Sequence, residues 1–129
     1  MEFINEYKVD GIWDEVEEKY DITVRQDIKA FFRKNGGKHP ITDVIDIKGE
    51  EYEVRVFLSI DEKNMYYVGK SLDYFLTNTD GQIIPVAIDS GSNYYCVNNK
   101  TGKVYYWSSE EDSYYPIANN LTSFCKLFK

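Results

Sequence analysis

The chain has 129 residues, 43% of them hydrophobic and 29% charged. A chain of this length fits one domain and buries roughly two-thirds of its unfolded surface, so it needs no disulfide or metal to be stable. Acidic residues outnumber basic residues by 22 to 15, which gives a net charge of −7. This charge argues against nucleic-acid binding, which requires a positive surface, and favours a basic partner or plain solubility. We therefore expect a single domain over residues 1–129.

The start of the chain and its cysteines indicate a compartment. Residues 1–6 carry acids where a secretion signal carries Lys or Arg. No apolar run approaches the length of a membrane span, so we expect a cytoplasmic protein without membrane contact. Cys96 and Cys125 lie far apart in apolar surroundings. In the cytoplasm we expect both to be buried free thiols that pack as small hydrophobic groups.

Two helices are predicted in the first third of the chain, after a polar lead-in over residues 1–10. Over 11–20, apolar residues recur every three or four positions, as on one helix face. These residues are Ile12, Trp13, Val16 and Tyr20. The second helix follows Thr23, which fits a capping box with Gln26, and glycines 36–37 end it. Its apolar stripe consists of Val24, Ile28, Phe31 and Phe32.

Two strands are predicted next, over 42–47 and 52–60, joined at the turn 48–50. The second strand has a period of two, which indicates that one of its faces is more buried than the other. The more buried set is Tyr52, Val54, Val56 and Leu58. A short helix is predicted over 71–77, and its inner face consists of Leu72, Phe75 and Leu76.

The densest strand pattern lies between residues 83 and 107. Ile83–Ile88 is a continuous apolar run, as expected of a strand buried on both faces. Residues 89–93 have turn chemistry, and strands rich in aromatic and β-branched residues follow over 94–97 and 103–107. Gly102 stands where it can close the hairpin between these two strands.

The chain closes with a loop over 108–113, a strand over 114–118 and a helix over 121–128 that Asn120 can cap. The inward residues of this helix are expected to be Leu121, Phe124, Cys125 and Phe128. Leading helices, a run of strands and a closing helix indicate an α+β domain. We expect two N-terminal helices and a C-terminal helix packed on a mostly antiparallel mixed sheet.

The order of these elements resembles the SMI1/KNR4 family of the SUKH superfamily. Residues 13–37, with their Asn-Gly-Gly end, are similar to the amino-terminal signature of that family. Ile84–Asp89, Gly91–Tyr94 and Gly102–Tyr106 are similar to its central signature, and the closing helix matches its end. The resemblance implies a non-enzymatic role. Bacterial members are mostly immunity proteins that bind and block the toxin domain of a polymorphic toxin system, and eukaryotic relatives are linked to the control of cell-wall synthesis.

The sequence contains no pattern of a catalytic or metal site. The single histidine, His39, lies beside Pro40 in an expected loop and has no triad pattern around it. One histidine and two distant cysteines cannot build a closed zinc site. The aspartates that could meet a hard cation lack the spacing of a calcium loop, and they are Asp43, Asp46, Asp61 and Asp89. We therefore expect no catalytic residue, metal or cofactor.

Aromatic runs are the most informative surface feature of the sequence. The chain has 12 Tyr, and several of them stand in the runs 94–95, 105–107 and 114–115. Alternation along a strand sends part of each run to the outer face, where Tyr and Trp suit protein binding. An acidic loop without Lys or Arg follows, and a basic partner would dock against it. The predicted binding residues are Tyr94, Tyr106, Trp107, Glu110, Glu111 and Asp112. The alternative is an aromatic core with scattered exposed rings.

These observations favour an immunity protein, monomeric or weakly dimeric, that neutralises a basic toxin domain such as a nuclease. A regulatory scaffold of the same fold, bound to another cellular protein, is the alternative. An enzyme with a dispersed site is a third reading.

Overall fold

The structure is a computed structural model that describes residues 2–128, with side chains over 11–128. It confirms the expected α+β class. In chain order the described elements are α1 (Glu2–Tyr20), α2 (Gln26–Asn35), β1 (Val44–Ile47), β2 (Glu50–Glu53), β3 (Val56–Phe57), α3 (Gly69–Asn78), β4 (Ile83–Ile88), β5 (Tyr94–Asn98), β6 (Val104–Ser108), β7 (Ser113–Ala118) and α4 (Leu121–Lys126).

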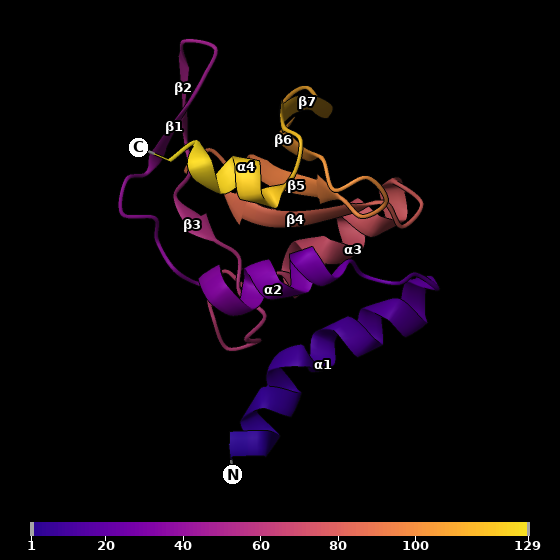
Figure 1. Cartoon of the computed structure of the whole chain (residues 1–129). Helices are drawn as coiled ribbons and strands as arrows, with labels where there is room; N and C mark the ends of the chain where they lie inside the picture. The colour runs from indigo at the N-terminus through magenta and orange to yellow at the C-terminus, as the bar shows by residue number, and fades with distance from the viewer. Residues whose placement is uncertain (1, 129) are drawn as a thin grey trace.

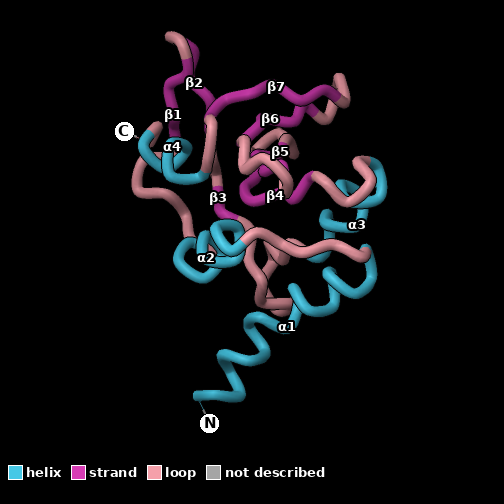
Figure 2. Tube along the Cα trace, turned by 45° about the vertical axis from the view of Figure 1, so that its right-hand side comes forward, coloured by secondary structure: helices cyan, strands magenta, loops and turns pink. Residues whose placement is uncertain are grey.

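One antiparallel sheet, in the order β3-β4-β5-β6-β7, forms the centre of the fold (Figure 1). Strands β1 and β2 form a separate antiparallel hairpin, which stands out from the body near the C-terminus. Figure 2 shows α2, α4 and the hairpin on one side of the sheet and α3 on the other. The sheet therefore has two differently covered faces.

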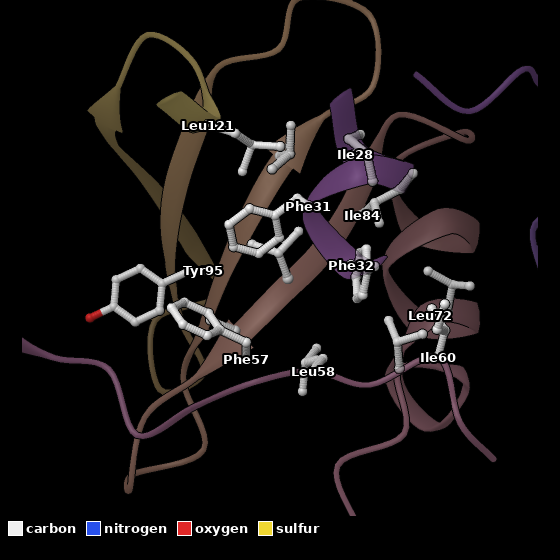
Figure 3. Packing of buried hydrophobic residues seen from close by; sticks show 14 of the residues in the cluster. Ile28, Phe31, Phe32, Phe57, Leu58, Ile60, Leu72, Ile84, Tyr95 and Leu121 are labelled. Carbon is white, nitrogen blue, oxygen red and sulfur yellow. The ribbon is translucent and has the colours of Figure 1, made fainter. Parts of the chain in front are cut away.

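The main hydrophobic core lies on the side of α2 and α4. Phe31 and Phe32 of α2 belong to this core, and Figure 3 shows both among its labelled residues. Trp13 of α1 packs edge-on against Phe32 at 5.0 Å between ring centroids, and Phe57 of β3 meets Phe31 at 5.4 Å. Edge-to-face pairs of this kind add to the free energy gained by burying apolar area.

The helix α1 is longer than predicted. The polar lead-in expected over 1–10 is wrong for residues 2–10, which belong to α1, and Met1 lies outside the described residues. Gly11 stands inside the helix, since a single interior glycine costs only about 1 kcal/mol relative to alanine.

The segment that leads into α2 is held by side chains outside it. The capping box predicted for Thr23 and Gln26 is wrong, because α2 begins at Gln26 and no side chain at its N-cap position bonds to the helix. Instead, Asn99 accepts a hydrogen bond from the Arg25 backbone N–H at 2.9 Å and donates to the Thr23 carbonyl at 2.9 Å. Glu17 accepts from the Val24 N–H at 2.8 Å. These bonds hold residues 23–25 outside the helix, so that α2 begins at Gln26.

The strand predicted over 52–60 divides into β2 and β3, which belong to different sheets. The chain turns at residues 54–55, where the Arg55 N–H begins to donate to Ile88 of β4 at 2.9 Å. The expected alternation is also wrong beyond this point. Residues 56–60 are all buried, because helices cover one face of β3 and the chain segment at Lys38 bonds to its free edge.

The remaining elements follow the prediction closely. Strand β4 is buried on both faces until its last residue, and α3 extends the predicted 71–77 by a few residues. Gly102 has φ +82°, the left-handed conformation that closes the β5–β6 hairpin. Asn120 caps α4 by accepting a hydrogen bond from the Ser123 N–H at 2.8 Å.

The two cysteines have different surroundings. Cys96 is fully buried, as predicted, and burial raises the pKa of its thiol well above the usual value. The predicted burial of Cys125 is wrong, because this side chain is exposed. Helix α4 ends at Lys126 rather than Phe128, and the fully buried position of its inner face is Phe124. The next residue of a helix is turned about 100° away, so Cys125 faces out.

Candidate protein-binding surface

Cross-strand register sorts the aromatic runs into two rows, one on each face of the sheet. Tyr94, Trp107 and Tyr114 are direct partners across β5, β6 and β7, and we call them the covered row. The next set of partners, Tyr95, Tyr106 and Tyr115, lies on the opposite face, and we call it the open row. Because neighbouring residues of a strand point to opposite faces, each run of tyrosines contributes to both rows.

Helix α3 packs on the covered row. The Phe75 ring lies 5.0 Å from Trp107 and 5.3 Å from Tyr94, both edge-on. Trp107 is only 7% exposed, and its indole N–H donates to Asp112 Oδ1 at 2.8 Å. The sequence prediction that this ring faces a partner is therefore wrong. The prediction failed because the position of α3 over this face is not visible in the alternation of β6.

The acidic loop predicted to bind a partner contains one structural carboxylate. Asp112 has φ +49°, and besides Trp107 it accepts a hydrogen bond from the Tyr74 hydroxyl at 3.4 Å. Asp112 therefore joins the turn between β6 and β7 to the covered row. Glu110 and Glu111 are exposed in the same turn.

The open row becomes more exposed from the middle of the sheet towards its edge. Tyr95 is fully buried, Tyr106 is half-buried and Tyr115 is 42% exposed. Figure 3 shows Tyr95 at the margin of the core, with its hydroxyl directed away from the apolar cluster. That hydroxyl donates to the Glu53 carbonyl at 2.6 Å, the Tyr106 hydroxyl donates to Asp89 Oδ2 at 2.9 Å, and the Tyr115 hydroxyl donates to Glu111 Oε1.

The β1–β2 hairpin extends this face. The Tyr52 ring meets Tyr106 edge-on at 5.2 Å, and its hydroxyl lies 3.5 Å from Glu50 Oε2. Three tyrosines thus share one surface, and each has a carboxylate at its hydroxyl end. We call this set the tyrosine–carboxylate surface, and it consists of Tyr52, Tyr106, Tyr115, Glu50, Asp89 and Glu111.

The tyrosine hydroxyls of this surface stay protonated at neutral pH. Burial raises the pKa of Tyr106 far above its usual value, and the adjacent Asp89 raises it further. Burial, followed by the charge of Glu50, raises the pKa of Tyr52. The hydrogen bond to Glu111 raises the pKa of Tyr115. Each hydroxyl is therefore a neutral donor, and it leaves the negative charge on the carboxylate that accepts from it.

The structure brings only part of the predicted set together. Tyr106 and Glu111 lie on the tyrosine–carboxylate surface, and Glu110 is exposed in the turn beside it. Tyr94, Trp107 and Asp112 belong to the covered side. Sequence reasoning missed Tyr52, Tyr115, Glu50 and Asp89 as members of one surface. The run 114–115 indicated Tyr115. The hairpin residues Tyr52 and Glu50 could be assigned to this surface only from the tertiary packing.

A shallow pocket of about 170 Å³ lies between α1 and α3, lined by residues such as Val16, Tyr67 and Leu72. Asp73 lies at its rim, where the Tyr20 hydroxyl and the Lys19 ammonium donate to the same Asp73 oxygen, Oδ1. The Tyr20 hydrogen bond, followed by the Lys19 contact, lowers the pKa of the Asp73 carboxyl. Ligand pockets usually exceed about 300 Å³, so this one is small for a substrate.

The side chains over 11–128 include no group of three or more His, Cys, Asp or Glu residues that could hold a metal ion. His39 is exposed, and its Nδ1 lies 3.0 Å from the Arg55 carbonyl oxygen. None of the described helices is both long and apolar enough to cross a membrane.

Taken together, the fold and this surface define a small α+β domain whose prominent surface feature is tyrosine paired with carboxylate. The chain belongs to the SMI1/KNR4 family (SUKH-1), whose sequence profile matches residues 10–126. The match covers every described strand, the helices α2, α3 and α4 and the second half of α1, and so confirms the resemblance noted from the sequence. A comparison with individual curated proteins found no match.

Proposed function

We propose that this chain is an immunity protein that binds a toxin domain and blocks it by occupying its working surface. The observation that carries the proposal is the tyrosine–carboxylate surface on a chain of this family. Tyrosine offers a large contact area with a polar tip at low entropic cost, so it is frequent in binding surfaces. Neutralisation by binding requires no catalytic group on the inhibitor.

The charge of the chain favours a basic toxin, and we propose a nuclease. An enzyme that acts on nucleic acid must hold phosphates with Lys and Arg. An inhibitor with a net charge of −7 complements such a surface and is steered towards it at a rate that falls with added salt. We place the encounter in the cytoplasm, where the nucleic acid of the cell is exposed to the toxin, and we propose that the chain acts as a monomer.

The test uses the toxin domain encoded by the gene beside the one for this chain. That domain is produced in cells with and without this chain, and growth is compared. The two purified proteins are then titrated by calorimetry and by a nuclease assay. We expect restored growth, a complex of equal stoichiometry and loss of nuclease activity. Undiminished toxicity together with the absence of a complex would overturn the proposal.

A further inference from the structure

We propose that the tyrosine–carboxylate surface binds arginine side chains of the partner, with guanidinium groups stacked on its tyrosine rings and paired with the carboxylates at their hydroxyl ends. This inference rests on the proposed function, because it names the chemistry that the toxin presents at this site. It goes beyond that function because it fixes both the face of the molecule and the type of residue it selects.

The first argument is the repeated pairing of ring and carboxylate. Tyr115 donates to Glu111, Tyr106 to Asp89 and Tyr52 to Glu50, so a negative charge lies at the end of each ring. A guanidinium group is planar, stacks on aromatic faces and forms paired hydrogen bonds with a carboxylate. A lysine ammonium makes the charge contact but lacks the planar stacking and the fork of donors. Arginine therefore matches both halves of each pair.

The second argument is charge complementarity. Several acids of this surface accept hydrogen bonds from uncharged donors, which do not neutralise them. Asp89 accepts from the Tyr106 hydroxyl at 2.9 Å, and Glu111 accepts from the Tyr115 hydroxyl. Three ion pairs of the described side chains, Lys19–Asp73, Arg25–Asp27 and Lys29–Glu17, lie on or beside α1, α2 and α3. The sequence from Val104 to Thr122 also contains no Lys or Arg. A cation from a partner would supply the missing charge.

The third argument is that the surface is held in place before binding. The Asp89 carboxylate accepts hydrogen bonds from the backbone N–H groups of Gly91 at 2.9 Å and Asn93 at 2.8 Å, which fixes the turn between β4 and β5. The contacts of Glu53 with Ser90 join the hairpin to that same turn. A surface with fixed side chains loses less conformational entropy on binding than a mobile one.

The chain offers a matched pair of tyrosines for the test. Tyr115 is 42% exposed on the open side, and Tyr74 is 45% exposed on the covered side. Both hydroxyls donate to an acid of the same turn, Glu111 and Asp112 respectively. Substitution of either by alanine removes a similar exposed ring, and only Tyr115 belongs to the tyrosine–carboxylate surface.

The probe is a peptide of alternating Arg and Gly, added to the ¹⁵N-labelled protein at low salt and followed by NMR. Peptides with Lys or Glu in place of Arg serve as controls. We expect shift changes at β2, β6, β7 and the turn 89–93, weaker changes with Lys and none with Glu. Tyr115→Ala and Glu111→Gln should each lower the affinity about two- to five-fold, as loss of an exposed cation–π or charge contact does. The charge control Glu18→Gln should leave it unchanged, and Tyr74→Ala should lower it less than Tyr115→Ala does, because the Trp107 N–H already donates to the carboxylate beside Tyr74.

Shift changes centred on α1, or equal affinity for the Arg and Lys peptides, would overturn the inference. A second arm repeats the variants with the toxin domain and separates this inference from the proposed function. If the toxin is neutralised and Tyr115→Ala with Glu111→Gln binds it as the parent chain does, the function stands and the arginine surface is wrong. If the Arg peptide binds as expected and no toxin is neutralised, the surface stands and the proposed function is wrong.

Discussion

The two faces of the central sheet carry nearly the same aromatic residues and have opposite surroundings. On one face, Phe75 of α3 packs against Tyr94 and Trp107, so that Trp107 is almost fully buried. On the other face, Tyr106 packs against Tyr95 and the hairpin residue Tyr52 and is half-buried, and Tyr115 is 42% exposed. The difference shows that composition sets how many rings a sheet carries. The helix that packs on it decides which of them are available to a partner.

The largest expected effect comes from removal of the ring that closes the covered face. Phe75→Ala leaves a cavity under Trp107 and Tyr94, and we expect a loss of about 3–5 kcal/mol in the free energy of unfolding, as for other buried Phe residues. Urea unfolding measures this loss. Tyr115→Ala is the control on the open face, with an expected loss below about 1 kcal/mol. Equal losses for the two variants would mean that the faces do not differ as described.

The second prediction concerns stability at high pH. It compares the buried end of the open row, Tyr95, with its exposed end, Tyr115. Burial raises the pKa of Tyr95 far above its usual value of 10.0. Above pH 10 the unfolded chain therefore loses this proton before the folded chain does, and stability falls as the pH rises. Below pH 10 both states are protonated and the contribution is constant. The slope from this one group approaches about 1.4 kcal/mol per pH unit.

Unfolding by urea at about pH 9 and about pH 11 measures this slope. Tyr95→Phe cannot ionise, so its stability should fall less between the two conditions than that of the parent chain. Tyr115→Phe should follow the parent chain more closely than Tyr95→Phe does, because the pKa of Tyr115 is raised by a hydrogen bond to Glu111 at an exposed site, where water weakens the effect. A parent slope that Tyr95→Phe leaves unchanged would show that other groups cause the alkaline loss.

The strands of the sheet were predictable because their patterns are local. The apolar run Ile83–Ile88, the turn at Gly102 and the cap at Asn120 each depend on a few adjacent residues, and the structure confirms them. The start of α2 was not predictable, since the segment before it is held by Glu17 of α1 and by Asn99, which is far away in the sequence. A capping pattern identifies a helix start only when contacts elsewhere do not hold its residues outside the helix, as Asn99 does here by bonding to Thr23 and Arg25.

The candidate surface was predictable only in part, for a similar reason. Alternation correctly divides the runs 94–95, 105–107 and 114–115 between two faces. It does not show which face α3 covers, so Trp107 was assigned to the wrong side. The division of the predicted strand 52–60 into β2 and β3 places Tyr52 against Tyr106, a contact that no local pattern indicates. When two separate elements form one surface, its residues can be identified only after the relative positions of those elements are known.

The smallest expected effect comes from the hydroxyl groups at the outer end of the open row. Tyr106→Phe removes a hydrogen bond to Asp89 from a half-buried position, where a net loss of about 1 kcal/mol is usual. Tyr115→Phe removes the bond to Glu111 at a position that is 42% exposed, and water replaces the lost donor. We expect the second change to alter the free energy of unfolding by less than about 0.5 kcal/mol, as surface substitutions do. Urea unfolding of both variants at neutral pH measures the two losses in the free energy of unfolding. A loss at Tyr115 as large as that at Tyr106 would show that the outer end of the row is held as firmly as its middle, and that its exposed ring contributes to the fold rather than being kept for a partner.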